Sequence, residues 1–382
     1  MDLWSELSDS CGAELGARPD LTPLYLPHVT SFLQEHCQVL GTDDEPDDSA
    51  LLVVPPLECL ASLFVAVPQE LAPIAPDSLR MAITLIETYH QQEHRRRQTA
   101  KQPLAIDGHD YEDDEVLDEH TKDVVVSALD LLASMSEGLG PSFQLLLVAG
   151  DAGAVSVGDA LAQNVLLCLQ DPSLTVRTAA FSAVGELASK CPSLLLPHSA
   201  GIMTAALDII QLDHEDVGRE DDELRSTQTN ATWMAGMIAE ALGPAALPFI
   251  AKLLHALIEL IHNLNKDRRE EGCDMLRFNI CVSLARFRAI DQAAVQAALP
   301  DIMNELYYNF QFLNEPDQCK ETLLAWRALT EALVADPSLV LGSTSLQNGF
   351  MTAAGRIVRL PESGELDVIR QIAESIQAQG GH

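Results

Sequence analysis

The sequence has few basic residues. Only 23 Lys and Arg stand against 57 Asp and Glu among 382 residues, which gives a formal net charge of −34. This charge repels nucleic acid phosphates and anionic lipid headgroups over a Debye length of about 8 Å, so we expect neither nucleic acid nor a membrane as a partner. A partner with basic segments is the natural complement, although many acidic proteins are acidic only for solubility.

The sequence also lacks the marks of a secreted or disulfide-stapled protein. Its eight cysteines include no CxxC pair, and the nearest two, Cys273 and Cys281, are eight residues apart. The first residues contain neither a basic region nor a continuous apolar core, and no apolar run reaches the roughly 18 residues of a membrane span. We therefore expect a soluble protein of a reducing compartment, the cytosol or the nucleus.

Catalytic motifs are scarce as well, since no Gly-rich phosphate loop, GxSxG elbow or Cys/His pair is found. One short match exists: His90, Glu93 and His94 have the spacing of an inverted zinc-peptidase motif, with two His ligands and a Glu as general base. Three arginines follow directly and would oppose a divalent cation. We expect a solvated helix end here, and no enzyme, metal or cofactor.

What the sequence does contain is helical periodicity. Aromatic residues make up only 5%, and residues 245–264 carry apolar side chains at spacings of three and four, which place one wide stripe on a helix. The members of this stripe are Ile250, Leu253, Leu254, Leu257, Ile258 and Ile261. A second helix follows at about 270–288, so the two form a helical hairpin. No segment is convincing as a strand, and the predicted class is all-α.

Comparable helix pairs recur along the chain. They are predicted at 157–170 with 173–190, 194–211 with 222–242, 292–312 with 317–334, and 338–358 with 365–378. The second helices end in similar wording, such as EGLGP at Pro141 and EALGP at Pro244, at intervals of 46 to 52 residues. This period is slightly longer than that of HEAT repeats. We predict one HEAT-repeat α-solenoid over 1–382 with about seven to eight helix pairs, interrupted by an acidic and basic loop insertion at 94–120 and a short acidic loop at 212–222.

A row of acidic residues lies on the predicted second helices. Asp130 and Glu137 are seven residues apart and so share one helix face, while Glu186 and Trp233 lie in the next two second helices. Carboxylates beside an indole are suited to Lys and Arg side chains, through ion pairing and cation–π contact. The simpler alternative is a solvated helix face and a packed Trp.

Several of these segments resemble the transportins, the karyopherin-β2 nuclear import receptors of the importin-β family. The likeness is carried by LYLPHVTSFLQEH (24–36), PPLECLASL (55–63), VVVSALDLLASMSEGLG (124–140), LQDPSLTVRTAAFSAVGELASKC (169–191) and NATWMAGMIAEALG (230–243). Their order and spacing agree from about residue 20 to 340. The resemblance corresponds to the carboxyl-terminal part of such a receptor.

The resemblance implies transport of cargo proteins through nuclear pores, between cytoplasm and nucleus. Cargo would carry a basic or hydrophobic segment ending in Pro-Tyr that lies on the concave face, with nuclear pore proteins and the Ran GTPase as further partners of the family. The repeats that mainly bind Ran have no counterpart here. Carried over to this sequence, the cargo-binding residues would be Val126, Asp130, Glu137, Glu186, Asn230, Trp233, Asn279 and Val282.

One residue departs from the family pattern in a way that matters for this reading. Arg225 lies two helical turns before Trp233, at a position that is usually apolar, and would place a positive charge near an incoming basic segment. Two alternatives stay open beside the import receptor. They are a HEAT scaffold that assembles other proteins and, less well supported, the zinc peptidase.

Overall fold

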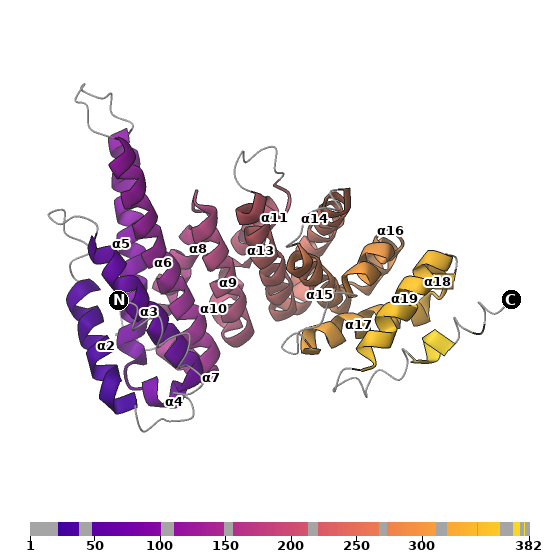
Figure 1. The fold of residues 1–382 in the computed structure, drawn as a ribbon, viewed down its shortest axis with the longest axis horizontal. Coiled ribbons are helices and arrows are strands. Elements are labelled where there is room, and N and C mark those ends of the chain that lie inside the picture. Colours follow the sequence, from indigo (N-terminus) through magenta and orange to yellow (C-terminus); the bar gives the residue numbers. More distant parts are fainter. Residues whose placement is uncertain are drawn as a thin grey trace. The chain divides into compact units, whose positions relative to one another are not determined.

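The computed structural model describes residues 22–37, 48–100, 111–148, 156–212, 221–266, 273–310, 319–341, 343–359, 370–374 and 378. Over these ranges all regular structure is helical, without a strand. The helices form stacked antiparallel pairs (Figure 1), so the predicted all-α fold of HEAT type is confirmed. The chain divides into two compact units, Met1–Ile202 and Met203–His382, each considered by itself. The single solenoid over 1–382 stays a prediction.

Unit 1 contains three helix pairs, followed by short connecting helices, of which the three α-helices start at prolines. The pairs are α2 (Thr22–Cys37) with α3 (Asp48–Ala66), α5 (Ala75–Ala100) with α6 (Tyr111–Leu139), and α8 (Val157–Cys168) with α9 (Leu174–Lys190). The connecting helices are α4 (Pro68–Leu71), α7 (Pro141–Val148), α10 (Pro192–Leu195) and the 3₁₀ helix η2 (Leu196–His198). The second helices α3, α6 and α9 pack side by side and form one row.

Unit 2 repeats this plan. Its helices are α11 (Ser199–Ile210, at the boundary), α13 (Asp221–Leu242), η3 (Gly243–Ala246), α14 (Leu247–Lys266), α15 (Asp274–Ile290), α16 (Gln292–Phe310), α17 (Cys319–Ala335), α18 (Ser338–Leu341) and α19 (Thr344–Ile357). The second helices α13, α15 and α17 again pack in a row. The predicted stripe of α14 is buried except at Ile258, which is half-buried. Of the last predicted helix, 365–378, the structure describes only helical residues 370–374 and 378.

The Gly-Pro steps do end second helices, as the repeated wording predicted. Gly140 follows α6 with a φ of 52°, and Gly243 follows α13 with a φ of 54°. Glycine adopts this left-handed conformation without the steric cost that a Cβ imposes, and it commonly ends helices for that reason. Pro141 follows directly and begins α7, and Pro244 is the second residue of η3.

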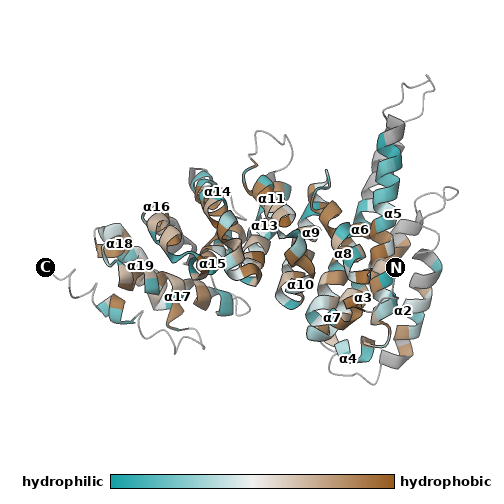
Figure 2. Cartoon of the chain, turned by 180° about the vertical axis from the view of Figure 1, so that it is seen from behind, coloured by the Kyte–Doolittle hydropathy of each residue, from teal (hydrophilic) through white to brown (hydrophobic). Residues whose placement is uncertain are grey.

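The segment 94–120 differs from its prediction as a loop. The first helix of its pair, α5, continues to Ala100, and α6 already begins at Tyr111, so only residues 101–110 lie outside the described structure. Both helices reach beyond the neighbouring α8–α9 pair (Figure 1), and the outer part of α5 is hydrophilic (Figure 2). The high charge of the segment favours a loop, but Glu, Gln and Arg are also good helix formers. At 212–222, α13 likewise begins at Asp221, while 213–220 lie outside the described residues.

Apolar helices are also longer than expected from the sequence. By length and composition alone, Pro192–Ile210 and Asp222–Leu264 are apolar enough to cross a membrane, and a bent pair, His120–Leu139 with Pro141–Val148, passes the same test as one span. The expectation that no stretch reaches this length is therefore wrong. Asp222–Leu264 comprises α13, η3 and α14, and α13 packs along α15. Helices inside a stack face neighbours on several sides, which raises their apolar content.

Candidate functional site

Glu58 on α3 and Asp130 on α6 form an acidic pair in unit 1. Helices α3 and α6 pack closely along each other, and both residues reach the surface, although the carboxyl group of Asp130 is partly covered by its neighbours. Burial of the Asp130 carboxyl group among its neighbours, and secondly the negative charge of Glu58, raises the pKa of Asp130 to about 6. A cation bound here would relieve the repulsion and favour the ionised carboxylate. Glu58 was missed from the sequence, because 72 residues separate it from Asp130.

The other predicted residues of unit 1 lie on α6 and α9. Glu137 is exposed two helical turns after Asp130, and Val126 is half-buried one turn before it. Glu186 is half-buried on α9, which packs against α6. Adjacent second helices of unit 1 therefore carry four carboxylates, counting Glu58, and this set is called the acidic row below.

In unit 2, Asn230 and Trp233 lie on α13 with part of each side chain exposed. They are three residues apart, so they are neighbours on one face of the helix. A partly exposed indole offers an aromatic face to an apolar or cationic side chain. The side-chain amide of Asn230 is suited to hydrogen bonding with a peptide backbone.

The two predicted residues on α15 are in a different situation. Asn279 is only 6% exposed, and its Nδ2 donates to the Thr229 carbonyl of α13 at 3.2 Å. Val282 is 0% exposed. Ser283 Oγ donates to the Thr232 carbonyl at 2.8 Å, in the same interface. Asn279 and Ser283 thus fasten α15 to α13, while Asn279 and Val282 are both buried and not open to a ligand.

Arg225 does not extend over the surface near Trp233. The side chain is 9% exposed, and its Nη1 donates to Gln228 Oε1 at 3.0 Å. Gln228 Nε2 in turn donates to the carbonyl oxygens of Ile209 and Leu212 at 3.3 and 3.0 Å. This polar cluster joins α13 to the end of α11, which explains how a charged residue is accommodated at a normally apolar position. The expected conflict with a basic segment is therefore smaller than the sequence suggested.

The residues of the zinc-peptidase motif have other partners. Glu93 pairs with Arg96 and Arg97, at 3.4 and 3.7 Å. His90 Nε2 lies 3.4 Å from Cys168 Sγ on α8, and burial lowers the pKa of His90, so its neutral form is favoured. Within the described ranges, no three His, Cys, Asp or Glu side chains converge in a way that would hold a metal ion.

Buried polar contacts next to His90 also tie its helix to the following pair. Tyr89 Oη donates to Asp171 Oδ2 at 3.1 Å, and Asn164 Nδ2 donates to Glu87 Oε1 at 3.1 Å. Asp171 Oδ1 accepts from the backbone N–H of Ser173 just before α9. This side of α5 therefore belongs to the packing between helix pairs and leaves no open site.

The chain is similar in sequence to curated transportins. Transportin-1 of Oryza sativa subsp. japonica is 26% identical over 345 residues, which are 90% of this chain and 33% of the relative. Importin subunit beta-2 of Schizosaccharomyces pombe is 24% identical over 345 residues, or 88% of this chain and 31% of the relative. Transportin-1 of Homo sapiens is 25% identical over 69% of the chain. The chain spans about a third of the length of the first of these relatives.

Comparison with family models and solved structures adds little to these sequence relatives. No family model matches the chain. A structure of Kap121p bound to RanGTP overlaps 99% of this chain and 38% of its own, at 12% identity and a TM-score of 0.41. So low a score carries no inference about function.

Proposed function

Because the chain is a relative of the transportins, members of the importin-β family, over nine-tenths of its length, we propose that it is the cargo-binding part of a nuclear import receptor. Its ligand would be an extended cargo segment rich in Lys and Arg, and its role would be binding without catalysis. The proposal includes shuttling between cytoplasm and nucleus, with nuclear pore proteins and, for the longer receptor, the Ran GTPase as further partners.

The observation that carries this proposal is the acidic pair of Glu58 and Asp130. Partial desolvation of the Asp130 carboxyl group raises its pKa and the cost of ionising it, and the negative charge of Glu58 on the neighbouring helix adds to that cost. A Lys or Arg side chain placed between them removes this repulsion and gains charge-assisted hydrogen bonds.

The acidic row extends this proposed site along unit 1. Glu137 and Glu186 would receive further cations of the same segment, and Val126 an apolar group. In unit 2, Trp233 would stack against an apolar or cationic side chain, and Asn230 would hydrogen-bond the extended backbone. Asn279 is proposed to support Trp233 indirectly, by holding α13 against α15, and Val282 by filling the core of unit 2.

Binding of a fluorescent peptide tests the proposal directly. The peptide carries a basic stretch followed by Pro-Tyr, and a peptide with its Lys and Arg replaced by Gln serves as its control. We expect saturable, salt-sensitive binding of the basic peptide alone. Asp130→Asn should weaken it by roughly tenfold to a hundredfold, since a hydrogen bond to a charged group contributes about 1.5–3 kcal/mol. Asp130→Lys should abolish it, and Trp233→Ala should weaken it while Trp233→Phe retains most of the affinity.

Asp301→Asn is the matched control, because Asp301 is an exposed aspartate on α16, a first helix of its pair. It makes the same change of charge outside the acidic row and should leave affinity nearly unchanged. Equal binding of the two peptides, or equal losses from Asp130→Asn and Asp301→Asn, would contradict the import-receptor proposal. Those outcomes would favour the HEAT scaffold.

A further inference from the structure

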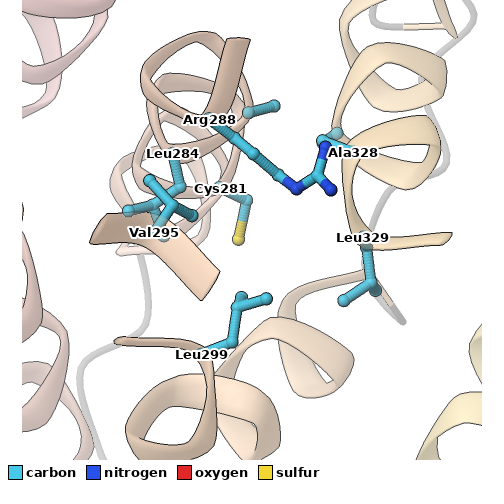
Figure 3. A pocket seen from close by; sticks show the side chains of 9 residues that line it. Cys281, Leu284, Arg288, Val295, Leu299, Ala328 and Leu329 are labelled. Atoms are coloured by element: carbon cyan, nitrogen blue, oxygen red, sulfur yellow. The ribbon is translucent and has the colours of Figure 1, made fainter. Parts of the chain in front are cut away.

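A small hollow lies in unit 2 between α15, α16 and α17, apart from the residues of the proposed cargo site. Its wall is apolar and comes from all three helices (Figure 3). The lining includes Leu284 and Cys281 of α15, Val295 and Leu299 of α16, and Ala328 and Leu329 of α17. Helices α15 and α17 are neighbouring second helices, so the hollow lies in the same row that carries Trp233 on α13.

Arg288 of α15 provides the only charge in this lining. Its side chain reaches across the gap toward Ala328 (Figure 3) and is 8% exposed. The guanidinium is held by Glu331 of α17, with Nη1 and Oε2 2.6 Å apart. Its Nε–H is buried and has no hydrogen-bond acceptor. An ion pair therefore neutralises the charge, while one donor beside the hollow stays unsatisfied.

The size of the hollow limits what it could accept. The free volume of the hollow is about 20 Å³, and about 310 Å³ when open solvent is included. The enclosed space has room for roughly one water-sized group, which corresponds to the end of an aliphatic side chain and is too small for an aromatic ring. Apolar walls and a neutralised Arg288 give no advantage to a cation there.

We propose that this hollow binds one aliphatic side chain of an extended partner peptide, whose adjacent backbone carbonyl accepts a hydrogen bond from Arg288 Nε. The end of the side chain replaces solvent against Leu284, Leu299 and Leu329. A small rotation of the guanidinium, with Glu331 still paired, brings Nε–H to the carbonyl. The side chain that enters the hollow is uncharged and apolar, whereas the acidic row would bind cationic side chains. This site therefore does not depend on the proposed binding of basic segments.

The test uses the whole chain with isotope-labelled Leu and Ala methyl groups and a minimal probe, N-acetyl-leucine methylamide. This probe has one aliphatic side chain between two peptide groups. We expect saturable shifts of the Leu284, Leu299, Ala328 and Leu329 methyl signals. The matching phenylalanine and lysine probes should bind at least tenfold more weakly. If all three probes shift these signals alike, the hollow is not a selective site and the proposal fails.

Two variants probe the two halves of the proposal. Ala328→Phe, at the half-buried rim, should fill the hollow and weaken binding of the leucine probe at least tenfold. Ala251→Phe, the same change at an exposed position of α14, should have no effect. Arg288→Lys keeps a positive charge for Glu331 but has no Nε–H at that position, and should weaken binding several-fold. Unchanged affinity in both Ala328→Phe and Arg288→Lys, in protein with a native circular dichroism spectrum, would overturn the proposal.

Discussion

The packing of α3 on α6, which brings Glu58 to Asp130, depends on a glycine. A Cβ added at Gly138 would lie 1.9 Å from the Phe64 carbonyl oxygen and 2.7 Å from its carbon. Real Cβ atoms do not approach other atoms within 3.0 Å, so Gly138→Ala requires the two helices to separate by at least about 1.1 Å. The obstacle is backbone in the last turn of α3, which cannot turn aside as a side chain could.

We expect Gly138→Ala to destabilise unit 1 by about 3 kcal/mol or more, the upper range for overpacking in a core. For a unit of about 200 residues this corresponds to a loss of roughly 6–12 °C in Tm. Thermal unfolding measures the total effect, and hydrogen exchange should show the loss of protection concentrated in α3 and α6. Separation of these helices should also lower the pKa of Asp130, because the carboxyl group would regain water.

Gly201→Ala is the matched control in α11. Nothing lies within 4 Å of the position of its Cβ, and the residue is helical. Alanine should therefore leave stability unchanged or raise it by up to about 1 kcal/mol. If Gly138→Ala shifts Tm no more than Gly201→Ala does, close packing of α3 on α6 is not what holds this part of unit 1 together.

Two further predictions concern charged residues. The pKa of Asp130 is raised from 3.8 to about 6, so the folded state retains this proton more strongly than the unfolded chain, and stability falls as the pH rises from about 4 to 6. Asp130→Asn should therefore be more stable than the parent chain at pH 7. Denaturant titrations should show that this difference in free energy of unfolding disappears below about pH 4. An equal difference at all pH values would argue against this account. Arg286 Nε pairs with Glu240 of α13 at 3.0 Å, and its Nη2 pairs with Glu321 of α17 at 2.7 Å. Arg286→Gln should lower the free energy of unfolding by about 1–2 kcal/mol, and Arg286→Lys should lower it less. Hydrogen exchange should become faster at the α13–α15 and α15–α17 interfaces. If both variants exchange at the same rate as the parent chain, these ion pairs do not stabilise the interfaces.

The helix pairs could be predicted well from the sequence because local information is sufficient for them. The apolar stripe of α14 extends over about three helical turns, and the Gly-Pro ends of α6 and α13 are two-residue signals, so each is a local pattern that predicts a helix or its end. The segment 94–120 was harder, since a charged stretch without an apolar stripe fits either a loop or a helix that projects from the stack.

The candidate site could be predicted only in part. Asp130 and Glu137 share a helix face by spacing alone, and the structure places both at the surface. Val282 and Asn279 have the same kind of spacing, yet α15 is packed so closely between its neighbours that both are buried. Periodicity assigns residues to faces of a helix, but which of those faces meets solvent depends on the neighbouring helices.

The sequence alone determined that this chain is a series of acidic helix pairs, because helical periodicity, glycine and proline at helix ends, and net charge are all local or additive properties. Only the tertiary structure decided that Glu58 stands beside Asp130, that Arg225 is held by Gln228, and that Arg288 crosses an apolar hollow with one donor unsatisfied. Each of these depends on a contact between side chains or helices, and the packing of the helices fixes its geometry. Local sequence patterns such as periodicity do not predict that packing.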